Sequence, residues 1–282
     1  MRSLHLRLLA FRLLLIFLSM SLACLTGAQE KSLSTLIAIS HVTLINPATS
    51  SVQPDATVLI ERDRITSVLI GAQVKLPGTA RVIDGHGKFL IPGLWDMHVH
   101  TAFGDWFPGG RGIILPLFIA NGVTGIRDMG GDLPALFAWR KQIAAQQIVG
   151  PRMVVSGPML DAVLPDGKLR FPSSIGVTTP ASAAAAVDAL KSQGVDFIKV
   201  QSALSHDAYL AAAAEAHKQN LPFVGHIPDK VRITEAIAAG QKSIEHLMGS
   251  FEGCSSEEQK FIDGQGTTKL LLTTTDKKNA MP

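Results

Sequence analysis

Apolar and polar residues alternate over short stretches within residues 34–90, and turn-forming residues separate these stretches. Alternation with a period of two is typical of strands with one buried face, and Pro, Gly, Asn and Asp mark the breaks between them. We therefore predict a small all-β unit, which we assign to residues 29–90. The predicted strands are "LIAISHVTLIN" (36–46), "ATVLIERDRITSVLI" (56–70) and "ARVIDGHGKFLI" (80–91), and the predicted breaks are "PATSSVQPD" (47–55) and "GAQVKLPGT" (71–79).

The pattern changes from about residue 90, where apolar strands alternate with helical stretches rich in Ala, Leu, Lys and Gln. A repeat of about 25 to 35 residues is typical of a parallel α/β fold, either a barrel or an open sheet. No phosphate-binding glycine loop follows the first strand, which disfavours an open nucleotide-binding sheet. We assign residues 91–282 to this α/β domain. Its predicted strands are "FLIPGLWDMHVH", "GVTGIRDMG", "RMVVSGP", "VDFIKVQ", "PFVGHI" and "KSIEHL", and its predicted helices are "RGIILPLFIAN", "DLPALFAWRKQIAAQQ", "TPASAAAAVDALKSQG", "SHDAYLAAAAEAHKQN" and "RITEAIAAG".

Polar residues interrupt or end most of the strands of the α/β domain. His98 and His100 stand two positions apart, so they project from the same face of their strand. In a barrel the C-terminal ends of the strands open onto one face, where active sites lie. We therefore expect four histidines, a lysine and an acid to lie close together at that end of the barrel. They are His98, His100, Asp128, Lys199, His226 and His246.

Each of these residues also has a purely structural interpretation. Two histidines on one strand are a weak sign of a metal, and a single histidine such as His226 or His246 is more often a hydrogen-bonded core residue than a ligand. Lys199 is harder to explain in this way. Its neighbours in "DFIKVQ" are apolar, and burying a lysine is costly without a charge partner or a chemical purpose.

The acids beside these histidines are expected to be structural. We interpret Asp128 as a structural residue or as part of the rim of the site. Asp96 and Glu245 adjoin candidate ligands but are expected to point to the opposite side of their strands, since successive side chains alternate. The remaining histidines receive no role: His5, His41, His86, His206 and His217.

The first residues have the pattern of a secretory signal. Three arginines precede or enter an apolar run over residues 13–25, and small residues follow at 26–28. The run of about 13 residues is shorter than the roughly 20 that span a bilayer. We therefore predict a signal peptide over residues 1–28 and an exported protein, periplasmic or extracellular, with no integral membrane span. A lipoprotein anchored at Cys24 is the less favoured alternative.

Charge and cysteine content limit the classes of partner. The chain has 26 basic and 23 acidic residues, and removing residues 1–28 takes away three arginines and no acid. The balance that remains does not favour nucleic acid or an anionic membrane as a partner. Only Cys254 then remains, so an intrachain disulfide is excluded and stability must come from a buried core. Homo-oligomerisation is left open.

The ordered motifs resemble those of the amidohydrolase superfamily, within it the imidazolonepropionase-like and prolidase-like group. The resemblance runs from about residue 36 to residue 258. It implies a metal-bearing (β/α)8 barrel, incomplete here with about six readable strands, and a small β-sandwich portion before it. It also implies a small-molecule or dipeptide substrate. The stretches that carry it are "IPGLWDMHVHT", "GVTGIRDMGG", "DFIKVQ", "PFVGH" and "SIEHL".

The resemblance also implies roles for the residues at the strand ends. His98 and His100 would bind a first metal ion, and His226 and His246 a second. Lys199 would carry CO2 as a carbamate and bridge the two ions. Imidazole nitrogen and carboxylate oxygen suit a divalent metal, and two zinc ions are expected. The implied reaction is hydrolysis of a C–N bond in a dipeptide or a cyclic amide by a metal-activated water.

One part of the family pattern is missing from the sequence. The resemblance implies a catalytic aspartate at the end of an eighth strand. Only 36 residues follow His246, whereas two further strand and helix units need on the order of 50 to 80. The catalytic acid/base is therefore not assigned. The sequence leaves two functions open, a metal-dependent amidohydrolase or a truncated, non-catalytic relative that binds only metal or a partner.

Overall fold

A computed structural model describes residues 36–71, 74–104, 110–256 and 258–264. The chain divides into two compact units, Met1–Pro92 and Gly93–Pro282. Each unit is described by itself. The predicted signal segment, with Cys24, lies outside the described residues and stays a prediction. In the part of the chain that is described, no helix is both long enough and apolar enough to cross a membrane.

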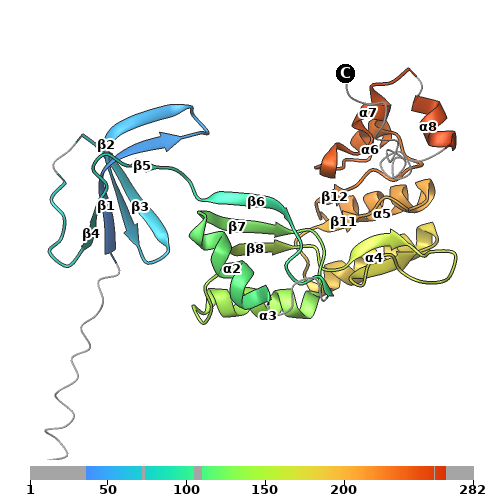
Figure 1. The fold of residues 1–282 in the computed structure, drawn as a ribbon, viewed down its shortest axis with the longest axis horizontal. Helices are drawn as coiled ribbons and strands as arrows, with labels where there is room; N and C mark the ends of the chain where they lie inside the picture. Colours follow the sequence, from blue (N-terminus) through green and yellow to red (C-terminus); the bar gives the residue numbers. More distant parts are fainter. Residues whose placement is uncertain (1–35, 72–73, 105–109, 257, 265–282) are drawn as a thin grey trace, which may run out of the picture. The chain divides into compact units, whose positions relative to one another are not determined.

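The first unit is a five-stranded sheet (Figure 1). Its central strand β1 pairs antiparallel with β2 and parallel with both β4 and β5, and β2 pairs antiparallel with β3. A short turn joins β2 to β3, as the pairing of Glu61 with Arg64 shows. The sheet is built from β1 (Leu36–Asn46), β2 (Ser51–Glu61), β3 (Arg64–Ile70), β4 (Arg81–Asp84) and β5 (Phe89–Leu90).

The predicted break at residues 47–55 is wrong in its length. The turn covers only residues 47–50, and β2 already begins at Ser51. Pro54 interrupts the alternating pattern without ending the strand. It lies between the paired residues Gln53 and Ala56, where the register with β1 shifts. A proline has no backbone N–H to donate to a neighbouring strand, so an irregularity of this kind accommodates it.

The second unit holds the parallel strands of a mixed α/β fold. One sheet has the order β6-β7-β8, and the other has the order β10-β9-β11-β12. All these pairings are parallel. The strands are β6 (Leu94–Val99), β7 (Val123–Asp128), β8 (Arg152–Val155), β9 (Met159–Ala162), β10 (Ser174–Val177), β11 (Ile198–Val200) and β12 (Phe223–Gly225). This arrangement is that of a (β/α)8-type barrel in part, without closure of the sheet.

The five predicted helices of the second unit lie where the sequence predicts them (Figure 1), and two further short helices follow. Side-chain caps mark the first turns of α3, α4 and α5. In α4, for example, Thr179 accepts a hydrogen bond from the backbone N–H of Ser182, Pro180 occupies the first turn, and Gly194 ends the helix at φ 84°. The helices are α2 (Gly110–Ala120), α3 (Leu133–Ala144), α4 (Pro180–Gln193), α5 (His206–Lys218) and α6 (Ile233–Ala238), followed by the short α7 (Ser250–Gly253) and α8 (Glu258–Gly264).

One apolar core joins these helices to the strands. Leu190 of α4 and Tyr209 of α5 are fully buried in the same cluster as Ile198 and Val200 of β11. Burying an apolar side chain of this size stabilises a fold by about 1.5–3 kcal/mol. The core therefore fixes β11 between its neighbours, and it fixes the position of Lys199 as well.

The predicted sixth strand of this domain, "KSIEHL", is only partly extended. Ile244 forms a single parallel bridge to Gly225 of β12. The chain then turns into a short 3-10 helix, Glu245–Leu247, inside which His246 has φ 58° and ψ 18°. Leu247 also has a positive φ, of 56°. The regular alternation of side chains therefore ends before Glu245.

His206 joins the start of α5 to α6. Its Nδ1 lies 3.1 Å from Asp207 Oδ1, and its Nε2 lies 3.0 Å from Glu235 Oε1. Hydrogen bonds to the carboxylates of Asp207 and Glu235 raise the pKa of His206 above its usual value. A histidine whose pKa rises on folding stabilises the fold fully below its unfolded pKa, and this contribution is lost as the pH rises through the folded pKa.

We therefore expect His206→Gln to destabilise the protein more at about pH 6 than at about pH 9. The pair is partly exposed, so the extra loss at low pH should stay below about 1 kcal/mol. Urea unfolding at both pH values measures it. His86→Gln, at an exposed position of the first unit, is the control. An equal loss at both pH values for His206→Gln would contradict the interpretation.

Candidate metal centre

The structure brings the four predicted histidines together. The ring centres of His98 and His100 are 5.3 Å apart, those of His98 and His246 are 4.6 Å apart, and those of His226 and His246 are 5.2 Å apart. His98 and His100 end β6 or follow it directly, His226 follows β12, and His246 follows the bridge at Ile244. Residues nearly 150 positions apart in the sequence thus form one cluster.

Close packing of strands places His226. It follows Gly225, whose φ is 136°, and a Cβ atom on that glycine would lie 2.3 Å from the backbone oxygen of Val200. Only glycine permits this approach of β12 to β11. The backbone N–H of His226 then donates to Val200 O at 3.0 Å. The imidazole is therefore anchored at the end of the strand.

Three of the four imidazoles have a defined hydrogen bond at Nδ1. His98 Nδ1 lies 2.7 Å from Glu245 Oε2, and His100 Nδ1 lies 2.8 Å from the backbone oxygen of Gly130. An ionised carboxylate and a carbonyl only accept, so in both rings Nδ1 carries the proton and Nε2 keeps its lone pair. His226 Nδ1 lies 2.8 Å from Ser202 Oγ.

Burial favours the neutral form of three of the four imidazoles. It lowers the pKa of His226 to about 2, with the nearby charge of Lys199 as the next cause, and it lowers the pKa of His100 and of His246 as well. A neutral imidazole is the form that binds a metal ion. The cluster therefore has the protonation state of a ligand set.

Lys199 is fully buried beside the histidines. Its Nζ has no hydrogen-bond partner within the described residues. Burial lowers the pKa of Lys199 to about 7, and the charge of Glu245 opposes this shift only in part. A buried amine without a partner costs free energy. The Lys199 amine therefore fits a role in which a bound or added group supplies its partner.

Asp128 ends β7 and is fully buried. Its Oδ2 accepts from the backbone N–H of Thr101 at 2.8 Å and from the Thr101 hydroxyl at 2.5 Å, and its Oδ1 accepts from the backbone N–H of Gly130 at 3.2 Å. Burial raises its pKa to about 6, although these hydrogen bonds counteract the shift. Asp128 thus ties together the two loops that follow His100 and β7.

The expectation that Glu245 points away from the histidines is wrong. Its carboxylate reaches His98, and it also accepts from Arg127 and Ser243. Strand alternation fails here because the backbone leaves the extended conformation at Glu245. Asp96 does not reach an imidazole in the same way, and its Oδ1 accepts from the backbone N–H of His98.

Sequence reasoning missed a second buried carboxylate near Lys199. Asp161 of β9 is fully buried, and its Oδ2 has no hydrogen-bond partner in the described ranges. The nearest cation is Arg170, whose Nε lies 3.9 Å from that oxygen. Burial raises the pKa of Asp161, and the charges of Arg170 and Lys199 oppose this. The sequence signal that could have revealed Asp161 is an acidic residue inside the otherwise apolar stretch "MLDA".

An aromatic contact connects the loop of Arg170 to the cluster. Phe171 packs on Phe103 with ring centres 5.8 Å apart, and Phe103 packs on His100 at 5.0 Å. The loop between β9 and β10 therefore lies beside the histidines. Its side chains form part of the wall of the candidate site.

The residues at the cluster fit a zinc site in donor type and in spacing. Two imidazoles on one tetrahedral zinc ion would have ring centres about 5 Å apart, given Zn–N bonds of about 2.0–2.1 Å. The observed separations are 4.6–5.3 Å. As the side chains stand, no group of three His, Cys, Asp or Glu in the described residues is arranged to hold an ion.

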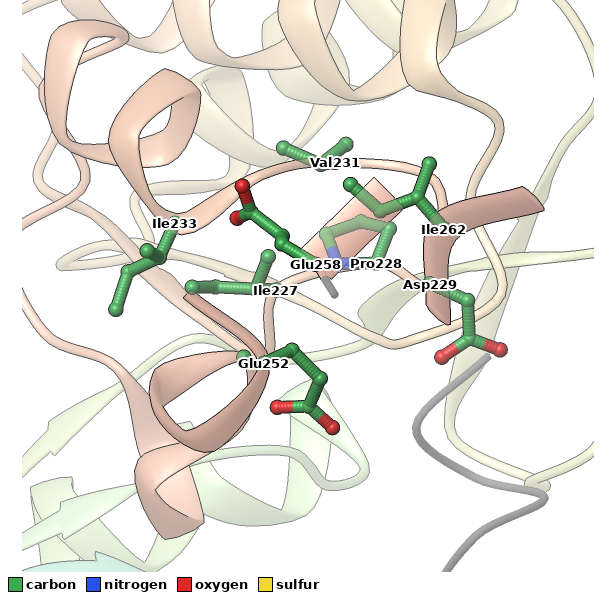
Figure 2. Close-up of a pocket in the computed structure, with 9 residues that line it drawn as sticks. Ile227, Pro228, Asp229, Val231, Ile233, Glu252, Glu258 and Ile262 are labelled. Atoms are coloured by element: carbon green, nitrogen blue, oxygen red, sulfur yellow. The ribbon is translucent and has the colours of Figure 1, made fainter. Parts of the chain in front are cut away.

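A separate small cavity lies between α6, α7 and α8. Its volume is about 20 Å³, which is room for one water molecule. Figure 2 shows that the carboxylates of Glu252, Glu258 and Asp229 lie apart around this cavity and do not converge. Glu258 is also paired with Arg232. The cavity therefore does not form a second cation site.

The sequence matches the amidohydrolase family over residues 89–264, which is more than half of the chain. The protein therefore belongs to the amidohydrolase family. A search of curated proteins found no match.

Solved structures of prolidase-like amidohydrolases have the same fold. A Bifidobacterium longum protein assigned as a prolidase is 26% identical, with a TM-score of 0.64 over 76% of this chain and 55% of that chain. Molinate hydrolase is 22% identical, with a TM-score of 0.65 over 77% of this chain and 59% of that chain. A. niger ochratoxinase is 21% identical, with a TM-score of 0.61 over 81% of this chain and 63% of that chain. The chain thus spans less than two thirds of the length of each.

Proposed function

We propose that the protein is a metal-dependent amidohydrolase that hydrolyses the C–N bond of a dipeptide or a cyclic amide. The observation that carries this proposal is the cluster of four imidazoles beside a fully buried lysine amine that has no hydrogen-bond partner among the described residues. Family membership supports the reaction class. The similarity to a prolidase and to molinate hydrolase supports an amide or a related substrate.

In this proposal His98 and His100 hold one divalent ion, and His226 and His246 hold the other. Both ions would be zinc. Lys199 contributes through its neutral amine, which adds CO2 and releases one proton to give a carbamate. The carbamate offers the oxygen ligands that bridging two ions requires. When bound, the metal would activate a water molecule and polarise the carbonyl of the scissile amide.

The other residues of the chain prepare the ligands. Glu245 and the carbonyl of Gly130 keep the protons of His98 and His100 on Nδ1, which leaves Nε2 for the metal. Asp128 holds the loops after His100 and β7 in place. In the described ranges no aspartate follows an eighth barrel strand, so the acid/base remains unassigned. The second candidate is a metal-binding relative without hydrolytic activity.

Hydrolysis assays on the zinc-loaded chain distinguish the two candidates. We expect amine release from a panel of dipeptides, including X-Pro dipeptides, and cyclic amides. The activity should disappear after chelation and return with zinc. Zinc binding without hydrolysis of any substrate would instead support the second candidate. A chain that binds no zinc and hydrolyses none of these substrates would disprove both.

A further inference from the structure

Arg127 of β7 donates hydrogen bonds to two different parts of the second unit. Its Nε donates to the backbone oxygen of Met97 at 2.6 Å, its Nη1 to Ser243 Oγ at 3.0 Å, and its Nη2 to Glu245 Oε1 at 2.8 Å. Only 12% of its side chain is exposed. The guanidinium group also lies over the ring of Phe197, 5.9 Å from its centre. Arg127 thus links the strand that bears His98 to the segment that bears Glu245.

The two carboxylate oxygens of Glu245 have separate partners. Oε1 accepts from Arg127 and, at 2.7 Å, from the Ser243 hydroxyl, whereas Oε2 accepts from His98 Nδ1 at 2.7 Å. The side chains of Arg127, Ser243 and His98 therefore all donate to this one carboxylate. Short, charge-assisted bonds of this kind are about twice as strong as neutral ones.

We propose that the Arg127–Glu245 pair is a positioning device that fixes both the tautomer and the orientation of His98. The carboxylate accepts only, so it requires the proton on Nδ1 and presents Nε2 to the centre of the cluster. Arg127 and Ser243 prevent the carboxylate from rotating, because they hold its other oxygen. His98 is therefore prepared as a ligand before any metal arrives.

Replacing Glu245 by glutamine distinguishes the positioning of His98 from a role in packing alone. It has nearly the shape of glutamate but only one acceptor oxygen. If that oxygen stays with Arg127 and Ser243, the amide NH2 faces His98 and demands an unprotonated Nδ1. The ring then moves its proton to Nε2, the nitrogen that the metal would use. The proposal rests on the proposed function for the use of Nε2, but the tautomer can be tested without metal.

The first measurement is the tautomer of His98 in the metal-free chain, from long-range 1H–15N correlation spectra assigned with His98→Asn. We expect the Nδ1–H form in the wild type and the Nε2–H form or a mixture in Glu245→Gln. A wild-type His98 in the Nε2–H form would overturn the proposal even if the variant failed to fold.

The second measurement is zinc affinity by competition with a chelator. Loss of an outer partner of a metal-bound histidine typically costs about 10- to 100-fold in affinity, and we expect Glu245→Gln to fall in this range. The matched control is Asp196→Asn, since Asp196 is likewise paired with an arginine, Arg140, at 2.7 Å, but away from the histidines. It should keep both the tautomer and the affinity. An unchanged tautomer in a folded Glu245→Gln would refute the proposal, whereas failure of every form to bind zinc would refute only the proposed function.

Discussion

Replacing His98 and His100 together by alanine should remove most of the zinc from the protein. The two imidazoles stand two positions apart at the end of β6, and their ring centres are 5.3 Å apart, the separation that a shared ion would need. Their loss should therefore weaken binding by more than the roughly 10- to 100-fold that removal of an outer partner costs. Elemental analysis after dialysis against a zinc buffer measures the remaining metal.

The control for this experiment is His86→Ala combined with His217→Ala. Both histidines are exposed and lie outside the cluster, so this variant removes as many imidazoles and should keep its zinc. Equal zinc content in the wild type and in the variant lacking His98 and His100 would show that the cluster is not a metal site.

Lys199→Ala should reduce the zinc content from two ions to one or none. The bridging oxygens come from the carbamate in the proposed site, and alanine cannot form one. A short carboxylic acid such as acetate should restore part of the second ion, because it supplies carboxylate oxygens in the space that the side chain vacates. Lys191→Ala, which removes an exposed lysine, is the control. Two zinc ions in Lys199→Ala without added acid would exclude a bridging role.

In the metal-free protein, the Lys199 amine should lower the free energy of unfolding. Its Nζ is buried without a partner in the part of the chain that is described, and such a group costs about 1–3 kcal/mol. Lys199→Met keeps much of the volume and removes the amine. We therefore expect a higher free energy of unfolding for this variant, together with the loss of the second ion. A destabilised Lys199→Met would mean that the amine has a stabilising partner in solution.

The helices and most strands of the second unit could be predicted because their signals are local. The cap at Thr179, the proline at position 180 and Gly194 mark the two ends of α4, and all three act within a turn of the helix. The clustering of the histidines followed from a single rule, that parallel strands end on the same face. Neither prediction needed knowledge of distant contacts.

The errors have a different origin, because each depends on a partner far away in the sequence. Pro54 stays inside β2 because the register shift with β1 accommodates it. Glu245 turns towards His98 because the backbone leaves the extended conformation there, and Arg127 of another strand then holds the carboxylate. Asp161 gave no periodic signal, and only the packing of β9 beside β11 brings it near Lys199.

The contacts of Asp128 separate the ligands from the loops that would recognise a substrate. One carboxylate fixes Thr101, directly after His100, and Gly130, whose carbonyl oxygen holds the His100 ring. On one loop the anchored residue, Thr101, directly follows His100. On the other loop the anchored residue is Gly130, two residues after the end of β7. Loop residues beyond these points can therefore be exchanged or lengthened without displacing His100, so in the proposed enzyme substrate preference could diverge during evolution while the proposed metal ligands stay in place.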